Sequence, residues 1–437
     1  MNFNIKNFKS KIANGFLHPY SKTYGYIDAE RYDSFQKVVE WRISKIEDTF
    51  RELKNRMSSD YYRDVAMAQS CAMDYAALHF PAYSFLITED LADDWLAIVD
   101  FHKKHARDHS LHQPLTAYVA AELLGYGDAD RALKIPVDPY NLLDFCVNAI
   151  LTKPEAAYIL ESAKRYGLPD NMLEKNDAAR EFWKGLFYQT VILSALFHDV
   201  GYPWQYVDRV GATLRKNVSR LHVSGKLISQ IIGEFKDRML FLPLRNYQMS
   251  HLAEPVFEEQ KLISLTSAAM ETHGFPGAVA FLTLNDAVRK SVVDEPIAKI
   301  HQFSVEWASM GIFMHDMEGM HKKRFPKLRL SFTQDPLSSL VSFADYLEEF
   351  NRPKAVFTLS EEGSKIKYET TCSDVELEVT ADGIMKVGMT YKDSNSKAIA
   401  SAFKNAETED YFNPSIGYID MSSIGIKRVD YYQGGLD

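Results

Sequence analysis

Apolar residues recur at helical spacing along most of the first 350 positions of the chain. The longest amphipathic stretch covers residues 32–57, where apolar side chains return every three or four positions. The stretch from Asn176 to Phe197 is similar, and Gly201 and Pro203 follow it as helix-ending residues. We therefore expect helices over residues 32–57, 60–79, 112–124, 138–166, 176–197, 262–283, 298–315 and 336–350.

The period of the pattern changes after Pro353. Alternating apolar and polar residues predict strands over residues 355–359, 365–371, 375–380 and 385–391. The dipeptide Asp382-Gly383 lies between the last two and is typical of a tight hairpin turn. A helix over 395–405 and further short strands over 417–430 complete a small α+β unit. The sequence thus predicts a mostly α-helical protein with a small C-terminal α+β domain.

Three regions follow from these patterns. Residues 1–100 are expected to form an N-terminal helical region, and residues 101–353 a helical domain. That domain contains a less regular and more basic insertion near 204–260. Residues 354–437 form the predicted α+β domain. A chain of 437 residues is long enough for two or three such regions.

Composition narrows the expected setting of the protein. A net charge of −9 gives no general attraction to nucleic acid or anionic lipid. The three cysteines, Cys71, Cys146 and Cys372, are far apart, which argues against a disulfide scaffold and favours a reducing cytoplasm. The N-terminus does not resemble a signal peptide, and no apolar run approaches the ~18 residues of a spanning helix. We expect a cytoplasmic protein without a membrane partner.

The stretch Ala195-Leu-Phe-His-Asp-Val-Gly-Tyr-Pro203 places His198 and Asp199 side by side at the end of an apolar helix. Imidazole nitrogen and carboxylate oxygen are ligands for divalent metals such as Mn, Fe, Co and Zn. Further candidates lie on or at the ends of other predicted helices, namely His112, His273, His315 and Asp345. Asp345 follows five residues of a helix that reads as buried, where an unpaired carboxylate costs several kcal/mol. A bound cation would remove this cost, although spacing alone does not show that the candidates converge.

The ordered set resembles the HD-domain superfamily of metal-dependent phosphohydrolases. Its segments are Arg107-Asp-His-Ser-Leu-His112, Ala195–Pro203 and Asp335-Pro-Leu-Ser-Ser-Leu-Val-Ser-Phe-Ala-Asp345, with Thr272-His-Gly274 and Phe313-Met-His-Asp316 between them. The resemblance covers roughly residues 100–353 and implies an HD-type helical bundle there. It implies one or two divalent metal ions (Mn, Mg, Fe, Co, Ni or Zn) bound by His112, His198, Asp199, His273, His315 and Asp345.

Two ligand positions keep alternatives open. The first histidine of the set is His112 or His109, and the apolar helical face that follows favours His112. His109 would then contact a ligand or the substrate. His198 and Asp199 match the central pair, with Asp199 able to bridge two metals. His273 and His315 match optional second-metal ligands, and His301 is a weaker substitute for His315.

The resemblance implies hydrolysis of a phosphomonoester or phosphodiester of a nucleotide-like small molecule. A bound metal lowers the pKa of water toward neutrality, which makes hydroxide available for attack at phosphorus. Arg107, His109 and Tyr202 are candidate substrate-binding residues, and Lys322, Lys323, Arg324 and Arg352 are further candidate cations. The Gly-Tyr-Pro at 201–203 lies too close to His198-Asp199 to match the subgroup that hydrolyses cyclic di-GMP. The Lys that many HD phosphodiesterases have after this pair is also absent.

Two other functions compete with this hypothesis. A non-catalytic HD scaffold could serve as a binding or regulatory protein, for which the α+β domain would suit ligand sensing or homo-oligomer formation. A nuclease or nucleotide triphosphohydrolase is the second, supported by the basic residues over 209–226 and implying nucleic acid as a possible partner.

Overall fold

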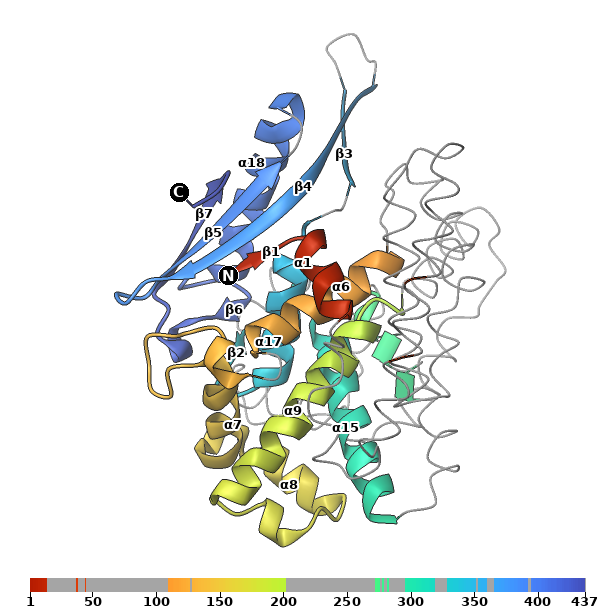
Figure 1. Ribbon diagram of the computed structural model, residues 1–437, viewed down its shortest axis with the longest axis vertical. Helices are drawn as coiled ribbons and strands as arrows, with labels where there is room; N and C mark the ends of the chain where they lie inside the picture. Colours follow the sequence, from red (N-terminus) through yellow and green to blue (C-terminus); the bar gives the residue numbers. More distant parts are fainter. Residues whose placement is uncertain are drawn as a thin grey trace, which may run out of the picture. The chain divides into compact units, whose positions relative to one another are not determined.

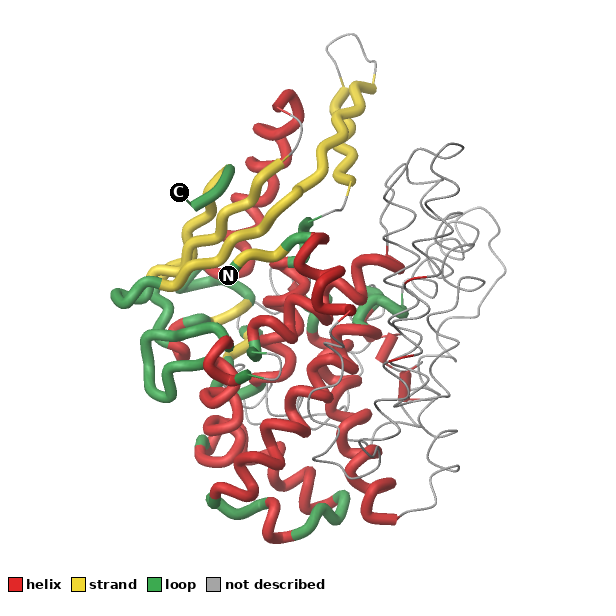
Figure 2. Tube along the Cα trace, in the orientation of Figure 1, coloured by secondary structure: helices red, strands yellow, loops and turns green. Residues whose placement is uncertain are grey.

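The structure is a computed structural model of the 437-residue chain. It describes residues 1–13, 37, 44, 109–125, 128–201, 272–275, 277–278, 281–282, 295–318, 328–350, 353–359, 365–391 and 394–436. The described part is mostly helical, with most of its strands in one five-stranded sheet (Figures 1 and 2). Most of the predicted N-terminal region and the insertion at 204–260 lie outside the described residues. Among the described helices, none combines the length and apolar character needed to cross a membrane.

The chain divides into two compact units. One comprises Met1–Phe145 with Phe343–Asp437, and the other comprises Cys146–Ser342. Along the chain, the boundaries fall inside helix α7 (Leu142–Thr152) and inside helix α17 (Pro336–Leu347). The sequence-based boundaries near residues 100 and 353 stay predictions.

The unit Cys146–Ser342 is helical. Its main elements are α8 (Ala157–Arg165), α9 (Asp177–Phe197) and α15 (Glu295–Met314), with 3₁₀ turns at Pro154–Ala156 and Asp170–Met172 and a two-residue strand β2 (Leu330–Ser331). Helix α9 begins where predicted, because Asn176 Oδ1 accepts a hydrogen bond from the backbone N–H of Ala179 at 2.8 Å. The prediction of a single helix over 138–166 is wrong, because α7 and α8 are separated at Pro154. Proline disfavours helical backbone at the preceding residue and has no N–H to donate.

Helices α9 and α15 pack in parallel and in register (Figure 1). Thr190 Oγ1 lies 2.9 Å from Ser304 Oγ, and Ser194 Oγ donates to the carbonyl of Ala308 at 3.0 Å, four residues further along both helices. Aromatic rings also pack between the two helices, with the ring centroid of Trp183 5.9 Å from that of Phe303 and 6.0 Å from that of Trp307. Parallel packing places the C-terminal ends of both helices at the same end of the pair.

The other unit contains the sheet. Its strands are β1 (Asn2–Phe3), β3 (Pro353–Leu359), β4 (Lys365–Val379), β5 (Ile384–Tyr391) and β7 (Arg428–Gln433), in the order β1-β4-β5-β7, with β3 also paired to β4. Helix α18 (Ser394–Phe412) connects β5 to the parallel strand β7, and a 3₁₀ turn (Ser422–Ile424) and strand β6 (Ile419–Asp420) lie between α18 and β7. The predicted mixed character of this region is confirmed.

Two details of the predicted sheet change. Residues 365–371 and 375–380, expected as separate strands, belong to the single strand β4, whose register against β5 shifts between Cys372 and Asp374. The hairpin at Asp382-Gly383 is as expected: Gly383 has a φ of +88°, and its N–H donates to the carbonyl of Thr380 at 3.0 Å.

The first residues of the chain join the same unit. Asn2 and Phe3 pair with β4 as an added strand, and α1 (Ile5–Ala13) follows. The rings of Phe3 and Phe8 pack against Tyr118 of α6 (His109–Leu123), with centroid separations of 6.4 and 5.5 Å. The sheet therefore includes residues from both ends of the sequence, which the expected confinement to 354–437 does not anticipate.

A buried cation joins α17 to α18. Lys404 is 1% exposed, and its Nζ donates to the carbonyl of Tyr346 at 2.7 Å and lies 3.9 Å from the centre of the Tyr346 ring. Its ion-pair partners are Glu407 at 3.0 Å and Glu349 at 3.5 Å. Burial opposes the charge, but these two carboxylates outweigh it and raise the pKa of Lys404 above its ordinary value. The contact fixes the C-terminal half of α17, which includes Asp345.

Candidate metal centre

The end of α9 determines the orientation of His198. The last carbonyls of a helix have no backbone N–H partner within the helix. One of them, the carbonyl of Ala195, lies 2.7 Å from His198 Nδ1. Because a carbonyl only accepts, Nδ1 holds the proton in this contact, and Nε2 is left with a lone pair in the neutral ring. His198 is fully buried, and Asp199, the next residue, is 6% exposed.

The end of α15 repeats this arrangement. His315 follows the last residue of α15, and its Nδ1 lies 2.6 Å from the carbonyl of Ile312, again three residues earlier. His315 is 2% exposed. Its ring lies edge-on to that of His198, with 4.8 Å between ring centroids. The two carbonyl contacts fix both imidazoles in the same tautomer, and parallel packing of the helices brings the two rings together.

The third histidine, His273, belongs to a short described segment at 272–275. Its backbone approaches the residues after His198 so closely that an added Cβ at Gly201 would lie 1.8 Å from the carbonyl oxygen of His273. Its ring is oriented by Asp316, whose Oδ2 is 2.7 Å from His273 Nδ1 and also accepts from the backbone N–H of His273 at 2.7 Å. Gly201, expected only to end a helix, thus allows the segment of His273 to pack against the central pair.

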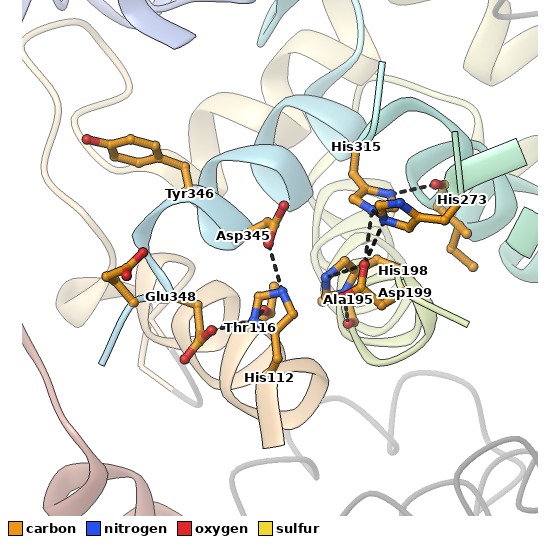
Figure 3. Close-up of polar contacts among 12 residues, drawn as sticks. His112, Thr116, Ala195, His198, Asp199, His273, His315, Asp345, Tyr346 and Glu348 are labelled. Carbon is orange, nitrogen blue, oxygen red and sulfur yellow. Dashed lines mark hydrogen bonds and ion pairs between the residues drawn. The ribbon is translucent and has the colours of Figure 1, made fainter. Parts of the chain in front are cut away.

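The three imidazoles converge on one carboxylate oxygen (Figure 3). Asp199 Oδ1 lies 2.8 Å from Nε2 of His273, 3.4 Å from Nε2 of His198 and 3.5 Å from Nε2 of His315. The Nε2 atoms of His273 and His315 are 3.0 Å apart. Ligand atoms of His198, Asp199 and His315 all lie within 4.8 Å of one another. Four of the six predicted metal ligands are therefore brought together within one unit.

The electrostatics of this cluster are unusual for a packed core. Burial alone would lower the pKa of His273, but the carboxylates of Asp316 and Asp199 outweigh it and raise that pKa to about 9. Burial likewise opposes ionisation of Asp316, yet the charge of His273 and the hydrogen bonds from it lower the pKa of Asp316. In the metal-free protein His273 therefore takes the charged form and donates from both ring nitrogens.

The remaining two predicted ligands lie in the other unit. His112 is 2% exposed and is located in the first turn of α6. Its Nε2 lies 2.9 Å from Asp345 Oδ1, and its Nδ1 contacts the buried carboxylate of Glu348 (Figure 3). Glu348 follows Asp345 by three residues, so both carboxylates project from neighbouring turns at the end of α17. That these residues ligate the same metal as the cluster around Asp199 stays a prediction.

The donor set suits a divalent transition metal. Each of the four histidines has its Nδ1 next to an acceptor, which leaves Nε2 as the available ligand atom. Around Asp199 Oδ1, the Nε2 atoms of His198, His273 and His315 all lie within 3.5 Å of the same carboxylate oxygen. These are ligand atoms that a cation among them could bind together. Three imidazoles and a carboxylate favour Mn, Fe, Co, Ni or Zn over Mg, which prefers oxygen ligands.

Other predicted site residues are placed differently. Arg107, Tyr202, Lys322, Lys323, Arg324 and Arg352 lie outside the described residues, and His109 begins α6 with a side chain that is not described. His301 is buried in α15 and precedes His315 by fourteen residues, which separates the two by roughly 21 Å along the helix. His301 therefore does not take the place of His315.

Sequence reasoning missed Glu348 and the role of Asp316. Both orient an imidazole through its Nδ1 atom. The available signals were the spacing of three residues from Asp345 to Glu348 and the second His-Asp dipeptide at 315–316.

Comparisons with protein-family models, with curated proteins and with solved structures gave no match to this chain.

Proposed function

We propose that this protein is a metal-dependent phosphohydrolase of the HD type, which hydrolyses a nucleotide or related phosphoester. The metal ligands would be His198, Asp199, His273 and His315, with His112 and Asp345 as further ligands on the resemblance described above. The observation on which the proposal rests is the convergence of three buried Nε2 atoms on Asp199 Oδ1.

Charge balance favours an anionic substrate. Neutral imidazoles add no charge, so Asp199 contributes the only formal negative charge among the four ligands of the cluster. A divalent cation held by this set would act as a Lewis acid, which would polarise a phosphoryl oxygen and favour ionisation of a nearby water molecule. The contribution of the chain is to fix the ligand atoms before the metal arrives: Ala195, Ile312 and Asp316 hold the three rings, and burial limits competing water.

The decisive experiment combines metal analysis with an activity screen. Purified protein would be loaded separately with Mn²⁺, Co²⁺, Ni²⁺, Zn²⁺ and Mg²⁺, and assayed on nucleotides, cyclic nucleotides and generic phosphodiesters. We expect His198→Ala and Asp199→Ala to lose bound metal and hydrolysis while helical circular dichroism stays nearly unchanged. His301→Gln is the matched control, because it alters a buried histidine of α15 outside the cluster, and it should keep both properties.

The outcomes separate the competing functions. Full metal content and activity in His198→Ala and Asp199→Ala would refute the assignment. Wild-type protein that takes up no metal would favour the non-catalytic binding or regulatory protein. Cleavage of single-stranded DNA or RNA, with binding that weakens steeply as salt rises, would favour the nuclease.

A further inference from the structure

The chain contains two His-Asp dipeptides at the ends of the parallel helices α9 and α15, and their aspartates face different partners. Asp199 presents Oδ1 to three imidazole Nε2 atoms. Asp316 instead contacts the opposite nitrogen of one ring, His273 Nδ1, at 2.7 Å. We propose that Asp316 is a positioning residue, which orients His273 as a metal ligand and increases the electron density on its Nε2. This inference rests on the proposed metal site.

The ring of His273 is held by a different kind of contact from those of His198 and His315. His198 and His315 each follow a long helix, and a free carbonyl at the helix end fixes their rings. His273 lies in a bend before a helical turn, in the described segment 272–275. The acceptor at its Nδ1 is Asp316, from a different part of the chain.

One carboxylate oxygen fixes both the backbone and the ring of His273. Asp316 Oδ2 accepts from the backbone N–H of His273 at 2.7 Å and from that of Gly274 at 3.3 Å, in addition to the ring contact. An added Cβ at Gly274 would lie 2.7 Å from the carbonyl oxygen of Phe313, so this segment lies directly against the end of α15. The ring is therefore held at its backbone and at Nδ1, and Nε2 points toward Asp199 and His315 (Figure 3).

A carboxylate does more than a carbonyl in this position. A negatively charged acceptor at Nδ1 draws that proton toward itself and makes Nε2 a stronger ligand, and loss of such a partner typically weakens metal binding by about 10–100-fold. Within the cluster around Asp199, two rings are held by neutral carbonyls and His273 by a carboxylate. Among these three ligands, His273 is the one whose strength depends on a replaceable side chain.

The test compares two carboxylate-to-carboxamide substitutions. Asp316→Asn removes the carboxylate that contacts His273, whereas Glu306→Gln replaces a buried carboxyl group of α15 that contacts Tyr166, nine residues before His315. Binding of Co²⁺ alone, followed by its visible absorption spectrum, needs no substrate. We expect Asp316→Asn to weaken Co²⁺ binding by about 10–100-fold and to alter the spectrum. Glu306→Gln should bind Co²⁺ as the wild type does, and Asp316→Glu should recover part of the lost affinity.

The outcomes distinguish this inference from the proposed function. Asp316→Asn with wild-type Co²⁺ affinity and spectrum would overturn the inference alone. An affinity for Co²⁺ that falls equally in Glu306→Gln would also overturn it, because the effect would then be general destabilisation. Wild-type protein that binds Co²⁺ and shows the Asp316 effect, yet hydrolyses no phosphoester, would support the inference and overturn the proposed function. Wild-type protein that binds no Co²⁺ would overturn both. If Asp316→Asn does not fold, the Asp316→Glu variant decides by its affinity and spectrum.

Discussion

Gly201→Ala is the substitution that most directly tests how the cluster is assembled. The three atoms nearest to the added methyl group would all belong to the backbone: the carbonyl oxygen of His273 at 1.8 Å and the N and Cα of Gly277 at 2.6 and 2.9 Å. Ordinary van der Waals contact begins at 3.4 Å, so the carbonyl must recede by about 1.6 Å. No side-chain rotation can relieve this contact.

The displacement has consequences for stability and for the metal site. Overpacking typically costs about 1–3 kcal/mol, and contact with backbone at three points places Gly201→Ala at about 3 kcal/mol. Moving the segment of His273 would also lengthen the 2.8 Å contact between its Nε2 and Asp199 Oδ1. We therefore expect at least a tenfold loss of Co²⁺ affinity, which corresponds to about 1.4 kcal/mol.

Chemical unfolding of the metal-free protein measures the first effect, and titration with Co²⁺ measures the second. Gly311→Ala provides the matched control. Its methyl group would meet the Ser194 hydroxyl at 2.3 Å, which can rotate away. Loss of the hydrogen bond from Ser194 costs about 1 kcal/mol, and the better helix propensity of Ala offsets this by about 1 kcal/mol. The stability of Gly311→Ala should therefore be close to that of the wild type. If Gly201→Ala is as stable as the wild type and binds Co²⁺ equally well, the argument that the segment of His273 packs closely against the residues after His198 and Asp199 is refuted.

Two further predictions concern buried charges away from the cluster. Burial lowers the pKa of His301 to about 4, so protonation favours the unfolded chain, and stability that is full above the ordinary pKa of 6.5 falls as the pH drops toward 4. The wild type should therefore lose about 2 kcal/mol of unfolding free energy between about pH 7.5 and about pH 5 that His301→Leu does not lose. Urea unfolding of both proteins at the two pH values measures this, and a difference in stability that does not change with pH would contradict it. Lys404→Met leaves Glu349 buried without its cation and should lower the free energy of unfolding by about 3 kcal/mol in the same assay. The double variant Lys404→Met with Glu349→Gln should recover part of this loss. Equal stability of Lys404→Met and the wild type would refute the argument.

The sequence predicts the helices better than the sheet. Helices α9, α15 and α17 follow from sustained apolar periodicity, and their ends agree with capping and helix-breaking residues to within three residues. The sheet depends on pairing between distant segments. Strand β1 has only two residues, too few for any period to be visible, and it forms because β4 offers a free edge at Val375 and Glu376. Strand β4 reads as two segments because a local irregularity near Cys372 interrupts its alternation.

The site is predictable in its residue types and not in its contacts. A buried His or Asp at a helix end is visible in the sequence, because it interrupts an apolar pattern. Convergence depends on whether two helices run parallel or antiparallel, and the composition of α9 and α15 does not determine this. Their direction follows from matched small and polar contacts, such as Thr190 with Ser304, whose significance is apparent only once both helices are placed.

The two His-Asp dipeptides show why identical local sequence does not imply identical chemistry. At 198–199 and 315–316, the histidine is fixed by the same contact, from Nδ1 to the carbonyl three residues earlier. The aspartates differ because their environments differ. Asp199 is 6% exposed and faces three Nε2 atoms, whereas Asp316, beside the segment of His273, meets two backbone N–H groups and an Nδ1 proton. Three hydrogen-bond donors contact Oδ2 of Asp316 without a metal. Asp199 Oδ1 instead lies within 3.5 Å of three imidazole Nε2 atoms, an arrangement that suits a shared cation. Metal binding should therefore depend on the charge of Asp199 directly and on that of Asp316 only through His273.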